Sequence, residues 1–304
     1  MISFQFKISK RRKLILLVII ISLVSFVLIF LPIDSDTTTT AELVIDITPI
    51  NPPKDWTELG RQARELKKIQ TDRLERHLYP WIIDSTGKSA FHTSSFSLGK
   101  GIVFTGGSKH VPILQVATNN IRSLGCELPI EIWYNGPQDM SPENIALLQR
   151  LPKVSPRDLS NYIGDTGEIG WQLKPFAALL SNFSQVILAD SDVLFFQSPD
   201  VFFESELYKS FGSLLFRDRS VEYGKWGYGP GAKSILNDLL DGNPPYYTNS
   251  RVLQSKSAME IDSGVVVINK NRNLHALLLT CRMNLPPFKD DLYSKSYGTA
   301  KHNF

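Results

Sequence analysis

Short apolar runs alternate along most of this chain with longer segments whose apolar residues recur at helical spacing. The apolar runs predict strands at 102–104, 130–134, 186–188, 213–216 and 264–268. The segments between them predict helices at 111–124, 142–151, 173–180, 232–240 and 274–283. Because strands and helices alternate, the pattern predicts an α/β fold with a mainly parallel sheet and crossover helices.

The N-terminal part follows a different pattern, with an uncharged apolar run at 14–31 that comes directly after a cluster of basic residues. As a helix this run spans about 27 Å, enough to cross a thin bilayer. Basic residues before it and acidic residues after it predict an uncleaved signal anchor with a cytosolic N-terminus, and a cleaved signal peptide is the alternative. The predicted organisation is a cytosolic tail at 1–13, a transmembrane signal anchor at 14–31, a stem at 32–97 containing a helix at 56–79, and a luminal domain at 98–304.

Composition adds little beyond this pattern. The chain is 42% hydrophobic with a net charge of +3, and the excess basic residues precede the apolar run. No basic stripe remains that would indicate a nucleic-acid partner. The sequence leaves two possibilities open for Cys126 and Cys281, a disulfide or two buried free thiols.

The strongest candidate for chemistry is the stretch QVILADSDVLFF at 185–196. Asp190 and Asp192 follow a buried apolar run, and in extended chain residues i and i+2 point to the same side. Both carboxylates are therefore expected to converge at the carboxyl end of the strand, where open α/β sheets bind ligands. Paired carboxylates suit Mn²⁺ or Mg²⁺, which bridge to substrate phosphates. The same tripeptide, Asp-Ser-Asp, occurs at 34–36 in a polar segment, where both acids are expected to be solvated. The residues around each copy are therefore what distinguishes a metal site from a solvated pair of aspartates.

Three further sets of residues are expected near the same sheet edge, each with an ordinary alternative. Thr105, Gly106 and Gly107 follow the first strand and would let a nucleotide approach the backbone, although strand-to-helix turns use glycine anyway. Lys174 could reach phosphates, or it could be a surface lysine. Glu260 and Asp262 precede the last strand and could accept hydrogen bonds from sugar hydroxyls, or they could belong to a capped turn.

These motifs occur in the order GIVFTGG, LPKV, GWQLKPFAALLSNFSQVILADSDVLFFQSPDVFF, EIDSGVVVINK and LLLTCRMN. In this order they resemble the fungal Golgi α-1,3-mannosyltransferases of the Mnn1 type, in glycosyltransferase family 71. The resemblance implies a GT-A fold, a Rossmann-like mainly parallel sheet with flanking helices, preceded by a transmembrane helix and stem. It also implies a type II Golgi membrane enzyme with a luminal catalytic domain.

The resemblance further implies the reaction and the roles of single residues. Mannose would pass from GDP-mannose, with retention of configuration, to a mannose of an N- or O-linked glycan, with α-1,3 linkage favoured over α-1,2. Mn²⁺, or Mg²⁺, would be held by Asp190 and Asp192. The donor would contact Thr105, Gly106, Gly107, Lys174 and Asp190, and the catalytic carboxylates would be Asp262 and Glu260. Other Golgi mannosyltransferases are possible partners.

Two alternatives stay open at this point. After Tyr297 and Gly298 the chain departs from the family pattern, because the acids expected there are missing and 299–304 end the sequence. A truncated, non-catalytic subunit that binds donor or glycan, or acts as a scaffold in a mannosyltransferase complex, would fit this departure. A phosphatase with Asp190 as nucleophile is the other alternative. It is disfavoured because the motif comes late in the domain and Leu194 stands where threonine or valine is expected.

Overall fold

The computed structural model describes residues 55–66, 98–162, 170, 172–222, 231–240, 250–258 and 260–297. The strands are β1 (Lys100–Thr105), β2 (Ile130–Tyr134), β3 (Val154–Asp158), β4 (Gln185–Ala189), β5 (Ser213–Arg217) and β6 (Ile261–Asn269). The α-helices are α2 (Trp56–Leu66), α4 (Val111–Ser123), α5 (Pro142–Gln149), α6 (Leu173–Leu180), α7 (Glu206–Phe211), α8 (Gly231–Leu240), α9 (Lys270–Met283) and α10 (Phe288–Tyr297). Short 3₁₀ turns are η4 (Ser108–His110), η5 (Leu159–Asn161) and η6 (Pro199–Glu204).

The strands form one six-stranded sheet in the order β3-β2-β1-β4-β6-β5. The pairs β3–β2, β2–β1 and β1–β4 are parallel, whereas β6 runs antiparallel to both β4 and β5. The expectation of a mainly parallel α/β sheet is confirmed, with β6 as the exception. Since β6 runs the opposite way, its first residues lie at the same edge as the carboxyl ends of the parallel strands.

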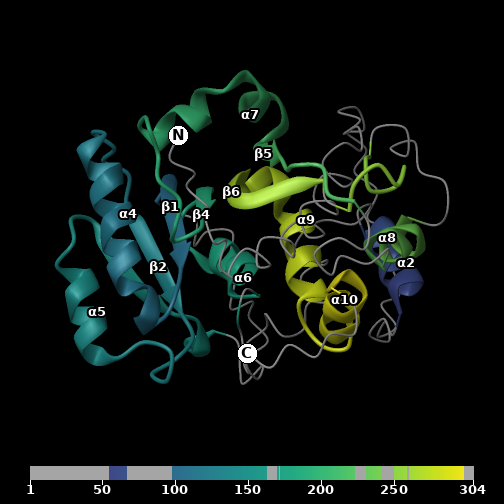
Figure 1. Cartoon of the computed structure of the whole chain (residues 1–304), viewed down its shortest axis with the longest axis horizontal. Coiled ribbons are helices and arrows are strands. Elements are labelled where there is room, and N and C mark those ends of the chain that lie inside the picture. The colour runs from purple at the N-terminus through teal and green to yellow at the C-terminus, as the bar shows by residue number, and fades with distance from the viewer. Residues whose placement is uncertain are drawn as a thin grey trace, which may run out of the picture.

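Alternating side chains along the strands divide the core between the two faces of the sheet. Ile102 and Phe104 of β1 belong to one cluster with Leu114 of α4 and Leu148 of α5. Val103 faces the other side and packs with residues of α6 and α9. Figure 1 shows α4 and α5 beside β1 and β2, and α6 and α9 farther along the sheet. The fold is therefore the three-layered arrangement of helix, sheet and helix that strands with two apolar faces require.

The two cysteines are buried free thiols in the structure. Cys126 belongs to the cluster on the α4 face, whereas Cys281 belongs to the cluster on the α6 and α9 face. The sheet separates them, which settles the question that the sequence left open.

Helix α2 packs into the domain. The ring of Trp56 lies 4.8 Å from the ring of Phe288, between centroids, and its indole N–H donates to Asp291 Oδ2 at 2.5 Å. Figure 1 shows α2 beside α8 and near α10. The helix predicted at 56–79 is thus observed as Trp56–Leu66, with the remainder outside the described residues. The domain boundaries stay predictions.

No helix in the described part of the chain is both long and apolar enough to cross a membrane. The predicted signal anchor at 14–31 lies outside the described residues, as does most of the predicted stem.

Candidate active site

The candidate site lies at the edge of the sheet where β4 ends and β6 begins. Ala189 of β4 pairs with Val265 of β6, so the residues that follow β4 meet those that open β6. The backbone N–H of Asp190 donates to Gly264 O at 2.9 Å, and the N–H of Gly264 donates to Asp262 Oδ1 at 2.6 Å. Asp190 and Asp262, which are 72 positions apart in the sequence, are thereby joined through one glycine.

Helix α6 delivers Lys174 to this edge. The lysine is buried, and its Nζ forms an ion pair with Asp190 Oδ1. Burial raises the pKa of Asp190, the Lys174 ammonium opposes this, and the neighbouring Asp192 and Asp262 raise the pKa further. Two carboxylates and one ammonium therefore act on Asp190 at this edge, and Lys174 is a buried lysine rather than the surface lysine that the sequence left open.

Asp192 reaches the site by a different backbone path from the predicted one. The strand ends at Ala189, and Ser191 and Asp192 lie in a turn closed by a hydrogen bond from Val193 N to Asp190 O at 3.1 Å. The expectation that the pair continues in extended chain is wrong, because the chain turns at Ser191 and Asp192. Asp192 is exposed and still acts electrostatically on Asp190.

The donor set can be tested against a divalent cation. Within the described ranges no group of three or more His, Cys, Asp or Glu side chains is arranged to hold a metal ion. Mg²⁺ and Mn²⁺ sites at phosphates, however, need only one or two carboxylates, with water and phosphate oxygens as the other ligands. Asp190 and Asp192 fit such a site. A cation bound there would share the carboxylate of Asp190 with Lys174.

The glycines after β1 have a clear packing role. A Cβ on Gly107 would collide with Asp139 Oδ1, and one on Gly106 would lie 2.9 Å from His110 Cβ. The N–H of Gly107 donates to His110 Nδ1 at 3.1 Å. Thr105 is half-buried at the end of β1. The structure places all three residues at the predicted edge, and their contact with a nucleotide stays a prediction.

The side chain of Glu260 contacts the segment 250–258, although the N–H of Asp218 donates to its backbone O at 3.2 Å. Its Oε2 accepts hydrogen bonds from Ser250 Oγ and Val252 N, both at 3.1 Å, and Arg251 Nε lies 3.9 Å from its Oε1. These contacts fix the segment 250–258 against the start of β6. A catalytic role for Glu260 stays a prediction.

Asp218 is a site residue that the sequence reasoning missed. It follows β5 at the same edge, is 6% exposed, and its Oδ2 is buried without a hydrogen-bond partner. Burial raises its pKa, and the nearby Asp262 raises it further. The available signal was an acid two residues after the predicted strand at 213–216, the same position that Asp190 occupies after the predicted strand at 186–188.

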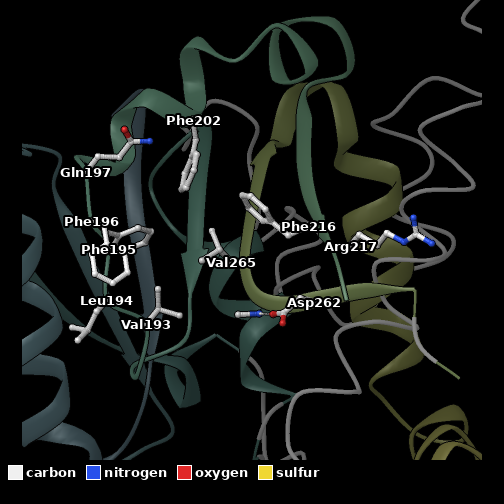
Figure 2. A pocket seen from close by; sticks show the side chains of 11 residues that line it. Val193, Leu194, Phe195, Phe196, Gln197, Phe202, Phe216, Arg217, Asp262 and Val265 are labelled. Atoms are coloured by element: carbon white, nitrogen blue, oxygen red, sulfur yellow. Dashed lines mark hydrogen bonds between the residues drawn. The ribbon is translucent and has the colours of Figure 1, made fainter. Parts of the chain in front are cut away.

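A cavity of about 540 Å³ opens at this edge, and Asp262 is the one of these acids that lines it. Figure 2 shows Asp262 on one side of it and Leu194, Phe195 and Phe196 on the other, with Phe202 and Val265 between. The volume is typical of small-molecule sites. The edge therefore combines carboxylates, a lysine and a largely apolar cavity, an arrangement suited to a ligand with phosphate and hydroxyl groups.

A family model described as "Mannosyltransferase putative" matches residues 99–303, well over half of the chain. The chain belongs to this mannosyltransferase family. Within it, the α-1,3-mannosyltransferase MNT3 of Saccharomyces cerevisiae is 28% identical over 222 residues, 62% of this chain and 35% of that protein. The α-1,2-mannosyltransferase MNN23 of Candida albicans is 27% identical over 279 residues, 80% of this chain and 45% of that protein. The family resemblance predicted from the motifs is thereby confirmed.

This member of the mannosyltransferase family spans less than half the length of either relative. Among solved structures, the galactosyltransferase LgtC in complex with donor and acceptor sugar analogs aligns with a TM-score of 0.37 and 13% identity, covering 64% of this chain and 69% of that one. The GT-A-like assignment rests on the mixed α/β sheet and on the family.

Proposed function

We propose that this chain is a metal-dependent mannosyltransferase that moves mannose from GDP-mannose to a mannose residue of an N- or O-linked glycan. The observation that carries the proposal is the meeting of Lys174, Asp190, Asp192 and Asp262 at one sheet edge beside a cavity. Family membership supplies the class of reaction. We further propose a type II protein of the Golgi membrane with this domain in the lumen, on the basis of the apolar run at 14–31.

The chemistry follows from the charges at the edge. Asp190 and Asp192 would hold Mn²⁺ or Mg²⁺, and the bound cation would neutralise charge on the diphosphate of the donor. Lys174 would add a positive charge next to the same phosphates. Asp262, held by the N–H of Gly264, would accept a hydrogen bond from a sugar hydroxyl on the side of the cavity. The acceptor hydroxyl would form a bond to C1 of mannose, with retention, as the bond between C1 and the diphosphate oxygen breaks. GDP would leave, and the hydroxyl proton would pass to the departing diphosphate. The linkage that we propose is α-1,3.

The test is incubation of the full-length chain with GDP-mannose, Mn²⁺ and mannobiose, with linkage analysis of the trisaccharide product. We expect transfer by the wild type and a loss of at least about 100-fold in Asp192→Ala, because a metal ligand is removed. Asp200→Ala is the matched control, since Asp200 is an exposed aspartate of η6 that does not line the cavity. Absence of transfer by the wild type, or equal rates in wild type and Asp192→Ala, would contradict the proposal.

One observation favours a second function, the binding of donor or glycan without turnover. The ion pair with Lys174 engages an oxygen of Asp190, the residue that a cation would need. A chain that binds mannobiose or GDP-mannose with the same affinity in Mn²⁺ and in EDTA, and that transfers nothing, would favour this function over catalysis.

A further inference from the structure

The cavity beside Asp262 is lined by two separate parts of the chain. The loop after β4 contributes Leu194, Phe196 and Phe202, whereas β5 and β6 contribute Phe216 and Asp262. In Figure 2 the loop residues 194–196 and Asp262 lie on opposite sides, so the cavity extends away from the carboxylate towards the loop. A ligand that fills it contacts an acidic end and an aromatic end.

Aromatic rings form a continuous row across this cavity. The ring of Phe202 lies 5.6 Å from that of Phe216 and 6.1 Å from that of Phe195, both in edge-to-face geometry. Beyond this row Phe196 is 98% exposed, and Leu194 is 54% exposed. A cluster of exposed apolar side chains at the mouth of a cavity indicates a surface that is covered when a ligand binds.

The polar groups of the cavity are few and differ between its ends. Asp262 is fixed by the N–H of Gly264, and Gln197 lies near the aromatic loop, whereas Arg217 points away from the rings in Figure 2. A sugar offers C–H faces that pack on aromatic rings and hydroxyl groups that donate to a carboxylate. A cavity of aromatic faces with a fixed carboxylate at one end therefore has the two kinds of surface that a saccharide needs.

We propose that this cavity is the acceptor subsite and that it binds at least two linked mannose residues. The reacting mannose lies at Asp262 and Phe216, and the preceding mannose packs on Phe196. The identity of the sugar rests on the proposed function, whereas the extended shape and the two ends rest on the residues of the cavity. A lipid surface is the competing occupant of exposed rings, but Asp262 lines this cavity and its carboxylate would repel anionic headgroups.

The test is an NMR titration of the full-length chain with methyl α-mannoside and with mannobiose, in the absence of nucleotide sugar. We expect mannobiose to bind more tightly than methyl α-mannoside. Phe196→Ala should weaken mannobiose binding on the order of fivefold and leave methyl α-mannoside unchanged, whereas Phe216→Ala should weaken both. Phe211→Ala is the matched control, because Phe211 is 38% exposed against 37% for Phe216 and lies outside the cavity.

Equal affinity for the two sugars, or unchanged mannobiose binding in Phe196→Ala, would overturn the proposal. So would a loss of binding to phosphatidylserine vesicles in Phe196→Ala with mannobiose binding intact, since the rings would then serve a membrane. Because no donor is present, this result is separate from the transfer assay. A chain that binds mannobiose through Phe196 but never transfers mannose would refute the proposed function and leave the subsite standing.

Discussion

At the scale of single residues, the pairing of Lys174 with Asp190 dominates the site. The two side chains are 8% and 18% exposed, so the pair lies largely out of water. Removing one partner of a buried pair leaves a charge that the interior cannot solvate. The same ion pair holds Asp190 in position for a ligand, so the Lys174–Asp190 contact serves both the stability and the function of the protein.

We expect Lys174→Met to lower the free energy of unfolding by about 3 kcal/mol at neutral pH, because Asp190 is left without its partner. Urea denaturation measures this change. The double variant Lys174→Met/Asp190→Asn should lose less than the sum of the single variants. The control is Lys153→Met, which breaks an ion pair with Glu127 whose side chains are 54% and 72% exposed, and it should cost much less than Lys174→Met. Equal losses in the two lysine variants would contradict this account.

Lys270 is a second buried lysine, at the opposite edge of the sheet. Its Nζ donates to Leu179 O at 3.1 Å and to Ser181 O at 2.6 Å, and so ties the end of α6 to the start of α9. Burial lowers the pKa of Lys270 to about 6, against a smaller opposing effect of Glu131. The pKa of Glu131, which is itself buried, is raised by burial.

This lowered pKa predicts a pH dependence of stability. Between pH 6 and the ordinary lysine value of 10.5, the unfolded chain carries a proton on Lys270 that the folded chain has released. Unfolding therefore takes up a proton, and the free energy of unfolding rises with pH, by about 1.4 kcal/mol per unit from this group. Urea denaturation between pH 7 and 9 should show this rise in the wild type and a smaller slope in Lys270→Met. Identical slopes would mean that Lys270 keeps its charge in the fold.

At the scale of elements, the sequence predicted the parts with strong periodicity. Strands β1, β2, β4, β5 and β6 and helices α4, α5, α6, α8 and α9 were expected, within a few residues at their ends. Strand β3 was not expected, because Pro156 interrupts it and its alternation is weak. Pro156 is tolerated because β3 is an outermost strand of the sheet, which has a neighbouring strand on one side alone.

The parts of the site that the sequence could not predict depend on tertiary pairing. The antiparallel direction of β6 brings Asp262 to Asp190, and nothing in the local pattern of 261–269 specifies that direction. The turn at 191–192 and the burial of Glu260 against the segment 250–258 depend in the same way on contacts with distant residues. Identities of residues at strand ends were predictable, whereas their orientations were not.

Helix α2 provides a prediction at this scale. Trp56 is 5% exposed and contacts α10 through Phe288 and Asp291. We expect Trp56→Ala to lower the free energy of unfolding by about 3 kcal/mol, because a buried tryptophan side chain is lost. Arg61→Ala on the exposed side of the helix is the control and should cost less than about 0.5 kcal/mol. If thermal denaturation shows no difference between these variants, α2 does not pack on the domain in solution.

At the scale of the whole molecule, the fold gathers charge at one edge of the sheet from three segments that are distant in the sequence. Lys174 comes from α6, Asp190 and Asp192 follow β4, and Asp262 belongs to β6. The other edge is closed by a structural network around Lys270. One edge of the sheet is thus left for ligands and the other holds the helices in place, a division common in open α/β sheets.

The most direct test of the central claim is calorimetric titration of GDP into the full-length chain, with Mn²⁺ and again with EDTA. We predict binding that requires Mn²⁺, that is lost in Asp192→Ala and that is kept in Asp200→Ala. GDP binding of equal affinity with Mn²⁺ and with EDTA, or unchanged binding in Asp192→Ala, would contradict a divalent cation held by Asp190 and Asp192.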